Sequence, residues 1–318
     1  ARGAAGGGGA APPFEREVMA TDDGGEVGLD WMRGCDSLWE GAPVVVCCHT
    51  TVGGSDWFAG FCEHARDAGF RPVVALRRGH IGRPLTSPRL NLVGLASDLE
   101  AQLRAVRTRY PHSLVFGYGA GAGGALLARY LGDTGRESAV HGATLVSPPH
   151  CTAPGRGALA RMPPATDARA AADVRRFFLE PNAAVLGQIE GYEACLRAKG
   201  LAEMQEHIHN VEGFRSPEEY VAATDPAAAF GRCAVPVLCI SAADDPVWER
   251  GGPGPEAEAL FEGPVDRALA VTARGAHRAF LEGGVLPVQR WCEVAALQFF
   301  AACVRDMGGA VEAAPGAG

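Results

Sequence analysis

Two polar side chains near the end of the chain have types that suit acid–base chemistry. Asp245 follows the apolar run 235–241 (VPVLCIS), and His277 follows the run 267–272 (RALAVT). A carboxylate that orients an imidazole, and an imidazole that moves a proton, are two parts of the triad by which many hydrolases activate a nucleophile. The sequence therefore predicts an acid at Asp245 and a base at His277, each at the end of a strand.

The place for a nucleophile lies earlier, in the stretch 113–132 (SLVFGYGAGAGGALLARYLG). This stretch predicts a buried strand over 113–118, a glycine-packed turn, and a helix that begins near Gly123. The same strand–turn–helix carries the motif G-x-S-x-G of a nucleophile elbow. Here Gly121 stands where that motif has serine, and the frame shifted by two residues puts Gly119 there. No frame across 117–124 offers Ser, Thr, Cys or Asp, so the stretch predicts an elbow without a nucleophile.

The glycines also fit the dinucleotide fingerprint G-x-G-x-x-G, with Gly119, Gly121 and Gly124. Two features argue against it: the strand is not the first of its sheet, and no acid ends the next predicted strand, 143–147, where a ribose would need one. A phosphate loop would need Gly-Lys-Ser/Thr, which is absent. The pair His207 and His209 has no companion ligand nearby and is predicted to face solvent rather than a metal. We expect no cofactor and no metal.

Strands and helices alternate along most of the chain, and the central strands are almost wholly apolar. This pattern predicts an α/β fold with a mostly parallel sheet and helices on both faces. The expected strands are 15–20, 26–32, 43–49, 72–76, 113–118, 143–147, 235–241 and 267–272, and the expected helices are 56–68, 92–109, one from about 123, 255–261 and 287–307. On one expected helix, Trp57, Phe61 and Ala65 form an apolar stripe.

The stretch between the two halves of this pattern is helical, and Ser216-Pro217-Glu218-Glu219 predicts a helix start there. We expect a flexible arm over 1–12, a core formed by 13–149 and 233–307, a helical cap inserted at 150–232, and a tail over 308–318. In such a sheet, functional groups gather at the carboxyl ends of the strands.

The chain resembles the abhydrolase-domain branch of the α/β-hydrolase family that includes the plant embryogenesis-associated proteins and the bacterial YheT-like esterases. The matching segments lie within about 14–305 and are REVMATDDGGEVGLDWM, HTTVGG, RRGHIGRPLTSPRL, DLEAQLRAVRTRYP, GAGAGGALLARYLG, VSPP, FRSPEEYVAATDP, VPVLCISAADDP and GAHRAFLEG. The resemblance implies an ester-hydrolysing scaffold. It places the base at His277, the acid at Asp245 and the nucleophile position at Gly121. It implies oxyanion donors at Thr50, where the family has glycine, and at Ala122. Arg77-Arg78 resembles the family's Arg-Gly turn, in which the arginine is expected to brace loops rather than bind substrate.

Bulk composition excludes several functions. The net charge of −8 argues against a general nucleic-acid binder, and no apolar window is long enough to span a membrane. Ten cysteines without a C-x-x-C motif, several inside apolar runs, predict buried thiols in a reducing intracellular compartment. Adjacent Cys47 and Cys48 are expected on opposite faces of a strand, so they cannot easily share a metal or form a disulfide. Cys48 and His49 are adjacent as well and face apart for the same reason, so His49 cannot act as a base for Cys48.

Two functional hypotheses follow. The first is a pseudohydrolase, a scaffold kept to bind a small acyl ligand or a protein partner, or to serve as a subunit of a larger assembly. The second is an active serine-type carboxylesterase or acylglycerol lipase, or an enzyme in which His277 activates water. The missing side chain at Gly121 favours the first, because acyl transfer needs an oxygen or sulfur beside the base.

Overall fold

The central sheet has eight described strands in the order β1-β2-β4-β3-β5-β6-β7-β8. The computed structural model describes residues 13–153, 160–247, 252–263, 266–283 and 289–312. The strands are β1 (Phe14–Ala20), β2 (Glu26–Met32), β3 (Val44–Cys48), β4 (Arg71–Leu76), β5 (Val115–Ala120), β6 (Gly142–Val146), β7 (Val237–Ala242) and β8 (Arg267–Thr272). The strands from β4 to β8 pair in parallel, whereas β1 and β2 form an antiparallel hairpin at the edge. The predicted mostly parallel sheet is confirmed.

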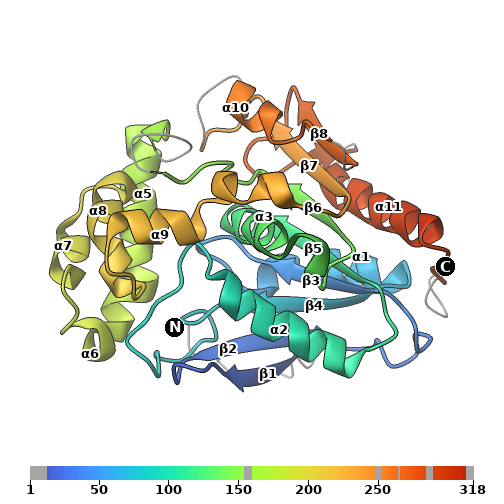
Figure 1. Ribbon diagram of the computed structural model, residues 1–318, viewed down its shortest axis with the longest axis horizontal. Helices are drawn as coiled ribbons and strands as arrows, with labels where there is room; N and C mark the ends of the chain where they lie inside the picture. Colours follow the sequence, from blue (N-terminus) through green and yellow to red (C-terminus); the bar gives the residue numbers. More distant parts are fainter. Residues whose placement is uncertain (1–12, 154–159, 248–251, 264–265, 284–288, 313–318) are drawn as a thin grey trace.

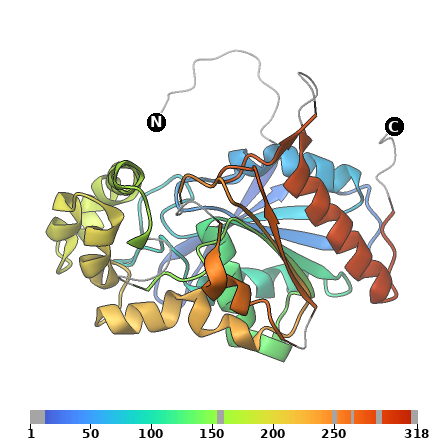
Figure 2. The ribbon, with the colours of Figure 1, turned by 90° about the horizontal axis from the view of Figure 1, so that it is seen from above.

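Helices cover both faces of this sheet, as Figures 1 and 2 show. The helices α1 (Ala59–Asp67) and α11 (Trp291–Asp306) pack on one face, and α2 (Ala96–Arg109) and α3 (Ala122–Thr134) pack on the other. Alternate residues of a strand pack on opposite faces of the sheet: Cys47 belongs to the apolar cluster under α1 and α11, and Cys48 to the cluster under α2 and α3. The predicted opposite orientation of these two thiols is therefore confirmed, and nine of the ten cysteines are buried.

A separate group of helices lies at one end of the sheet, on the left of Figure 1. It contains α5 (Pro164–Val174), α6 (Ala183–Leu186), α7 (Tyr192–Arg197), α8 (Leu201–Val211) and α9 (Pro217–Thr224), with short turns at Arg175–Leu179 and Glu180–Asn182. We call this group the helical cluster. Its own apolar core includes Val174, Phe178, Met204 and Ile208 and also takes in Leu92 from the sheet side.

The predicted start of α9 is confirmed, since the Ser216 hydroxyl accepts a hydrogen bond from the Glu219 N–H. The Glu219 carboxylate also accepts a hydrogen bond from the Arg215 N–H at 2.9 Å. The proposed boundaries of core and cap, at 150 and 232, stay a prediction. The arm 1–12 lies outside the described residues, as does 313–318 of the tail, while Val311 packs against the larger apolar cluster.

Several expected elements begin or end elsewhere. Helix α2 starts at Ala96 rather than at residue 92, and the segment before α1 is a short 3₁₀ turn, Ser55–Phe58. The last helix starts at Trp291, preceded by β10 (Gln289–Arg290), which pairs with β9 (Leu281–Glu282) in a small hairpin that the sequence pattern did not predict. The helix α10 (Gly254–Ala259) is slightly earlier than expected. These shifts leave the carboxyl ends of β3, β5, β7 and β8 at one edge.

Candidate active site

The elbow turn joins β5 to α3 and passes through Gly121. This residue has φ 54° and ψ −122°, and its N–H donates to the Val146 carbonyl at 2.9 Å. The Gly121 carbonyl in turn accepts from the Gly124 N–H at 2.9 Å. A residue with a Cβ is strained at such a positive φ, whereas glycine adopts it freely. The backbone therefore has the sharp strand-to-helix turn that the sequence predicted.

The glycines on either side of Gly121 serve close packing. A Cβ on Gly123 would lie 2.0 Å from the Cys48 carbonyl oxygen, and one on Gly119 would lie 2.7 Å from the Gly124 Cα. At Gly121, by contrast, the nearest atoms to a Cβ would be side-chain atoms, Thr50 Oγ1 at 2.7 Å and His277 Nε2 at 3.5 Å among them. The position of Gly121 thus faces the predicted base, while its neighbours face backbone.

The predicted acid and base lie together. His277 Nδ1 and Asp245 Oδ2 are 2.9 Å apart, and Asp245 is 3% exposed. The other carboxylate oxygen accepts from the Val247 N–H at 2.9 Å, which fixes the carboxylate plane. A carboxylate on Nδ1 holds that nitrogen as the proton donor and leaves Nε2 to act on a substrate or nucleophile.

The turn that carries His277 is held in place by Asp244, the residue before the predicted acid. Asp244 Oδ1 accepts hydrogen bonds from the N–H groups of Gly275 and Ala276, both at 2.8 Å. Ala276 has φ 46°, an uncommon value for a residue with a Cβ. Strained backbone of this kind persists where surrounding contacts over-determine it, and it concentrates at functional turns.

The two predicted oxyanion positions border the same space. Thr50 follows β3, and its carbonyl oxygen accepts a hydrogen bond from Arg77 Nη2 at 2.8 Å. His49 Nδ1 lies 2.8 Å from the same carbonyl oxygen. Ala122 is the first residue of α3, where N–H groups have no intrahelical partner and the helix dipole is positive. Together with Gly121 and His277 they line one cavity. Their role in binding an oxyanion stays a prediction.

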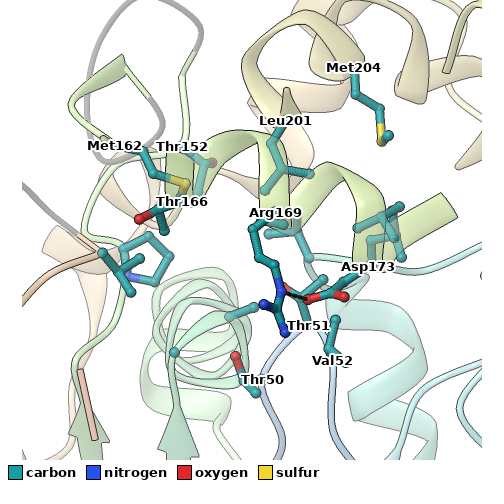
Figure 3. Close-up of a pocket in the computed structure, with 18 of the residues that line it drawn as sticks. Thr50, Thr51, Val52, Thr152, Met162, Thr166, Arg169, Asp173, Leu201 and Met204 are labelled. Carbon is teal, nitrogen blue, oxygen red and sulfur yellow. Dashed lines mark ion pairs between the residues drawn. The ribbon is translucent and has the colours of Figure 1, made fainter. Parts of the chain in front are cut away.

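That cavity has a volume of about 350 Å³ and lies between the carboxyl edge of the sheet and the helical cluster. Its walls are mainly apolar, with Val52, Leu92, Met162, Met204 and Ile208 among them. Figure 3 shows Arg169 of α5 pointing down above Thr50 and Thr51, next to Asp173 on the same helix. Arg169 Nε and Asp173 Oδ2 are 3.6 Å apart. The arrangement suits a ligand with an apolar body and a small polar end.

Buried charges support the loops beneath the cavity. Arg78 forms a two-pronged ion pair with Asp98, at 2.7 and 2.8 Å, and a further pair with Asp23 at 2.7 Å. Arg77 donates instead to the Thr50 carbonyl, and burial lowers its pKa to about 10. These contacts agree with the bracing role that the resemblance implied for this turn.

A buried carboxylate from the helical cluster reaches the same region. Glu212 has 0% exposure, and its Oε1 accepts from the Leu92 N–H at 2.9 Å. Burial is the main reason why the pKa of Glu212 is raised to about 7. His80 is half-buried, and desolvation lowers the pKa of its ring to about 3, so that the ring is neutral at physiological pH.

The structure corrects two assignments made from sequence. Trp57 was expected on the buried stripe of a helix, but it is 52% exposed and lines the cavity mouth. His209 was expected to face solvent, but it is 8% exposed. No group of three potential metal ligands occurs among the described residues. Sequence reasoning also missed Arg169 and Arg278, whose only signal was their position in the predicted cap and directly after His277.

Comparison with known proteins adds a family to this geometry. The sequence is 32% identical to human Protein ABHD15 over 304 residues, which are 92% of this chain and 63% of the human protein. It is 27% identical to mouse Phospholipase ABHD3 over 290 residues, which are 86% of this chain and 68% of the mouse protein. Embryogenesis-associated protein EMB8 of Picea glauca and the protein YheT of Escherichia coli are also similar, at 28% and 26% identity. No family model matches the chain.

Among solved structures, an esterase of Pyrococcus furiosus superposes with a TM-score of 0.55 at 13% identity, over 92% of this chain and 91% of the esterase. Sheet, helices and this likeness define an α/β-hydrolase fold. The chain belongs to the abhydrolase-domain family, in the branch that includes EMB8 and YheT. The predicted resemblance is confirmed. The chain spans slightly less than two thirds of ABHD15, at 63% of its length.

Within the part of the chain that the structure describes, no helix combines the length and apolarity that crossing a bilayer requires.

Proposed function

We propose that this protein is a catalytically impaired α/β-hydrolase that binds an acyl-type ligand and forms no covalent acyl-enzyme. One observation carries the proposal. The residue that faces the base is Gly121, since a Cβ built on it would lie 3.5 Å from His277 Nε2. Glycine has no side-chain oxygen or sulfur. Nucleophilic catalysis needs such an atom within hydrogen-bond reach of the base. The acid–base pair is retained, but the atom that it would activate is absent from the side chain at 121.

The apolar cavity is the second support for a binding role. A ligand pocket of this kind is mostly apolar, with a few polar groups that orient the ligand. Here the polar groups at the sheet edge are His277, Thr50 and the N–H of Ala122, while the helical cluster supplies apolar walls. The relatives named as a phospholipase and as esterases act on acyl compounds by their names. We therefore propose an acyl chain with a carbonyl or acid end as the ligand class.

A second candidate is residual hydrolysis by water. Thr50 Oγ1 and His277 Nε2 flank the point where a Cβ on Gly121 would lie, at 2.7 and 3.5 Å. A water molecule at that point could donate one proton to His277 while its oxygen attacks a bound ester carbonyl, and His277 would return the proton to the leaving alcohol. This reading keeps the esterase or lipase chemistry of the family without a serine. It also predicts no covalent intermediate.

We further propose that the protein works as a subunit of a larger assembly or with a protein partner. A chain that specifies a full core without a nucleophile is maintained for contacts rather than for acyl transfer. A specific interface would bury on the order of 1,000 Å² or more. Native mass measurement on the protein from its source tests this part: a lone monomer that co-purifies with nothing contradicts it.

Serine-directed phosphonate probes test the catalytic part. The wild-type protein should stay unlabelled and hydrolyse short-chain esters at the background rate. Gly121→Ser should place a hydroxyl next to His277, and labelling should appear at residue 121. In the same background, His277→Ala should abolish it. Strong wild-type ester hydrolysis that is lost in His277→Ala would contradict the proposal and favour activated water. A folded Gly121→Ser protein that stays unlabelled would show that the oxyanion turn at Thr50 or the pocket has been lost as well.

A further inference from the structure

The residue directly after the base places a second cation at the cavity. Arg278 lines the cavity together with His277 and Trp57. Its guanidinium carbon lies 4.5 Å from the centre of the Trp57 ring, a distance at which a cation is attracted to the ring face. Stacking of this kind orients the planar guanidinium and leaves its edge, with the N–H donors, available to a ligand.

Among the described residues Arg278 has no ion-pair partner, although the Glu293 carboxylate acts on its charge at longer range. Among the described residues, no carboxylate oxygen lies within 4.0 Å of its guanidinium, the limit for an ion pair. The second arginine of the cavity, Arg169, has an ion-pair partner, since it lies 3.6 Å from Asp173. Arg290 on β10, which does not line this cavity, pairs with Glu293 at 3.1 Å. Burial lowers the pKa of Arg278 from its ordinary value. A partly buried cation without a matched anion is costly, and an anionic ligand would offset that cost.

The rest of the cavity restricts what such an anion can be. Its walls are apolar on the side of the helical cluster, where Met162, Met204 and Ile208 lie. A small inorganic anion would leave this apolar space unused, and a neutral ester would leave Arg278 unmatched. The N-terminal end of α3 at Ala122 borders the cavity and adds a positive potential for an anion near Gly121. Only an amphiphile satisfies both ends of the cavity.

We propose that the preferred ligand of this cavity is a fatty-acid-like carboxylate, whose acid group pairs with Arg278 beside His277 and whose tail fills the apolar space. This inference rests on the proposed function, because it assumes that the cavity binds a ligand. It narrows the ligand from acyl compounds in general to the free acid. A guanidinium matches a carboxylate with two parallel hydrogen bonds, which a neutral alcohol or ester cannot form.

Calorimetric titration with dodecanoate and with dodecanol, which share one tail, tests this at neutral pH. Hydrogen bonds to charged groups contribute enough that dodecanoate should bind the wild-type protein about ten-fold tighter or more. Arg278→Gln should remove most of this preference, and Arg278→Lys should keep part of it. Arg104→Gln is the matched control, since it removes one positive charge from an exposed residue of α2 that pairs with Glu100. It should change neither affinity.

The outcomes separate the two proposals. Equal affinity for the two ligands in the wild-type protein, or a preference that survives Arg278→Gln, would overturn the carboxylate inference and leave a general acyl pocket. Binding of neither ligand would overturn the proposed binding function together with the inference. Circular dichroism of each variant establishes that it is folded, and Arg278→Lys keeps the test decisive if Arg278→Gln does not fold.

Discussion

Two turns meet at the carboxyl edge of the sheet: the elbow turn at Gly121 and the turn 275–280 that carries His277, called here the base turn. Both have positive φ values, but only the base turn has them at residues with a Cβ. The elbow turn reaches φ 54° at Gly121, where the residue has no Cβ. The base turn reaches φ 46° at Ala276 and φ 40° at Phe280, where both residues have one. The elbow turn has thus kept its sharp geometry at almost no conformational cost, whereas the base turn keeps its geometry against a cost of order 1–3 kcal/mol per strained residue.

The base turn retains that strain because its contacts are numerous. Asp244 accepts from two of its N–H groups, Phe280 is 3% exposed, and the Trp291 N–H donates to the Phe280 carbonyl at 2.8 Å. The elbow turn keeps its shape through the close packing of Gly119 and Gly123 and through the backbone hydrogen bonds of Gly121. The two turns therefore depend on different stabilising contacts, and substitutions can separate them.

The largest effect is expected at the elbow. Gly123→Ala should destabilise the protein by about 4 kcal/mol or more, because its Cβ would lie 2.0 Å from the Cys48 carbonyl oxygen and backbone would have to move. Helix propensity alone predicts the opposite sign, a gain of about 1 kcal/mol. Gly121→Ala is the matched control and should cost only about 1–3 kcal/mol through its positive φ, because its Cβ would meet the Thr50 side chain, which can move, rather than backbone. Urea unfolding of both variants measures the difference. Equal losses would contradict the assignment of a backbone clash to Gly123 and not to Gly121.

The next effect concerns the anchor of the base turn. Asp244→Ala removes the acceptor of two hydrogen bonds, from Gly275 and Ala276, and should lower the free energy of unfolding by about 1–2 kcal/mol, since Asp244 is exposed. Combined with Gly121→Ser, it should also slow phosphonate labelling, because His277 would lose its fixed position. Asp244→Asn keeps one acceptor oxygen and should lie between. Labelling at an unchanged rate would show that Asp245 alone positions the base.

Much of this frame could be predicted from the sequence. Continuous apolar runs identify strands that are buried on both faces, and the order of turn, acid and base along the chain places Gly121, Asp245 and His277 at one edge. Glycine spacing predicts the elbow because only glycine tolerates the close approach at 119 and 123. These features depend on local sequence, and local reasoning suffices for them.

Contacts between distant segments could not be predicted in this way. The leucines at 92 and 95 fit the period of the following helix, yet α2 begins at Ala96. The Leu92 N–H donates to Glu212, 120 positions away, and the Leu95 N–H donates to the Asn91 side chain, so the segment before α2 is held in a non-helical form. Exposure of Trp57 and the unmatched charge of Arg278 depend in the same way on how the helical cluster and the β9–β10 hairpin sit on the sheet.

The smallest effect is the reverse exchange in the base turn. Ala276→Gly should stabilise the folded protein by roughly 0.5–1 kcal/mol, because relief of a left-handed alanine is worth about 1–2 kcal/mol and the added freedom of glycine in the unfolded chain costs about 0.5–1 kcal/mol.

The same substitution tests whether the strained backbone at Ala276 positions His277. With Gly121→Ser, Ala276→Gly should label more slowly than Gly121→Ser alone, because the residue before His277 would sample more conformations. Thermal unfolding gives the first quantity, and the labelling rate gives the second. A variant that gains stability and labels at the same rate would contradict a positioning role for Ala276 and leave its strain as a by-product of chain connection. A variant that loses stability would show that contacts of the Ala276 methyl group outweigh the strain.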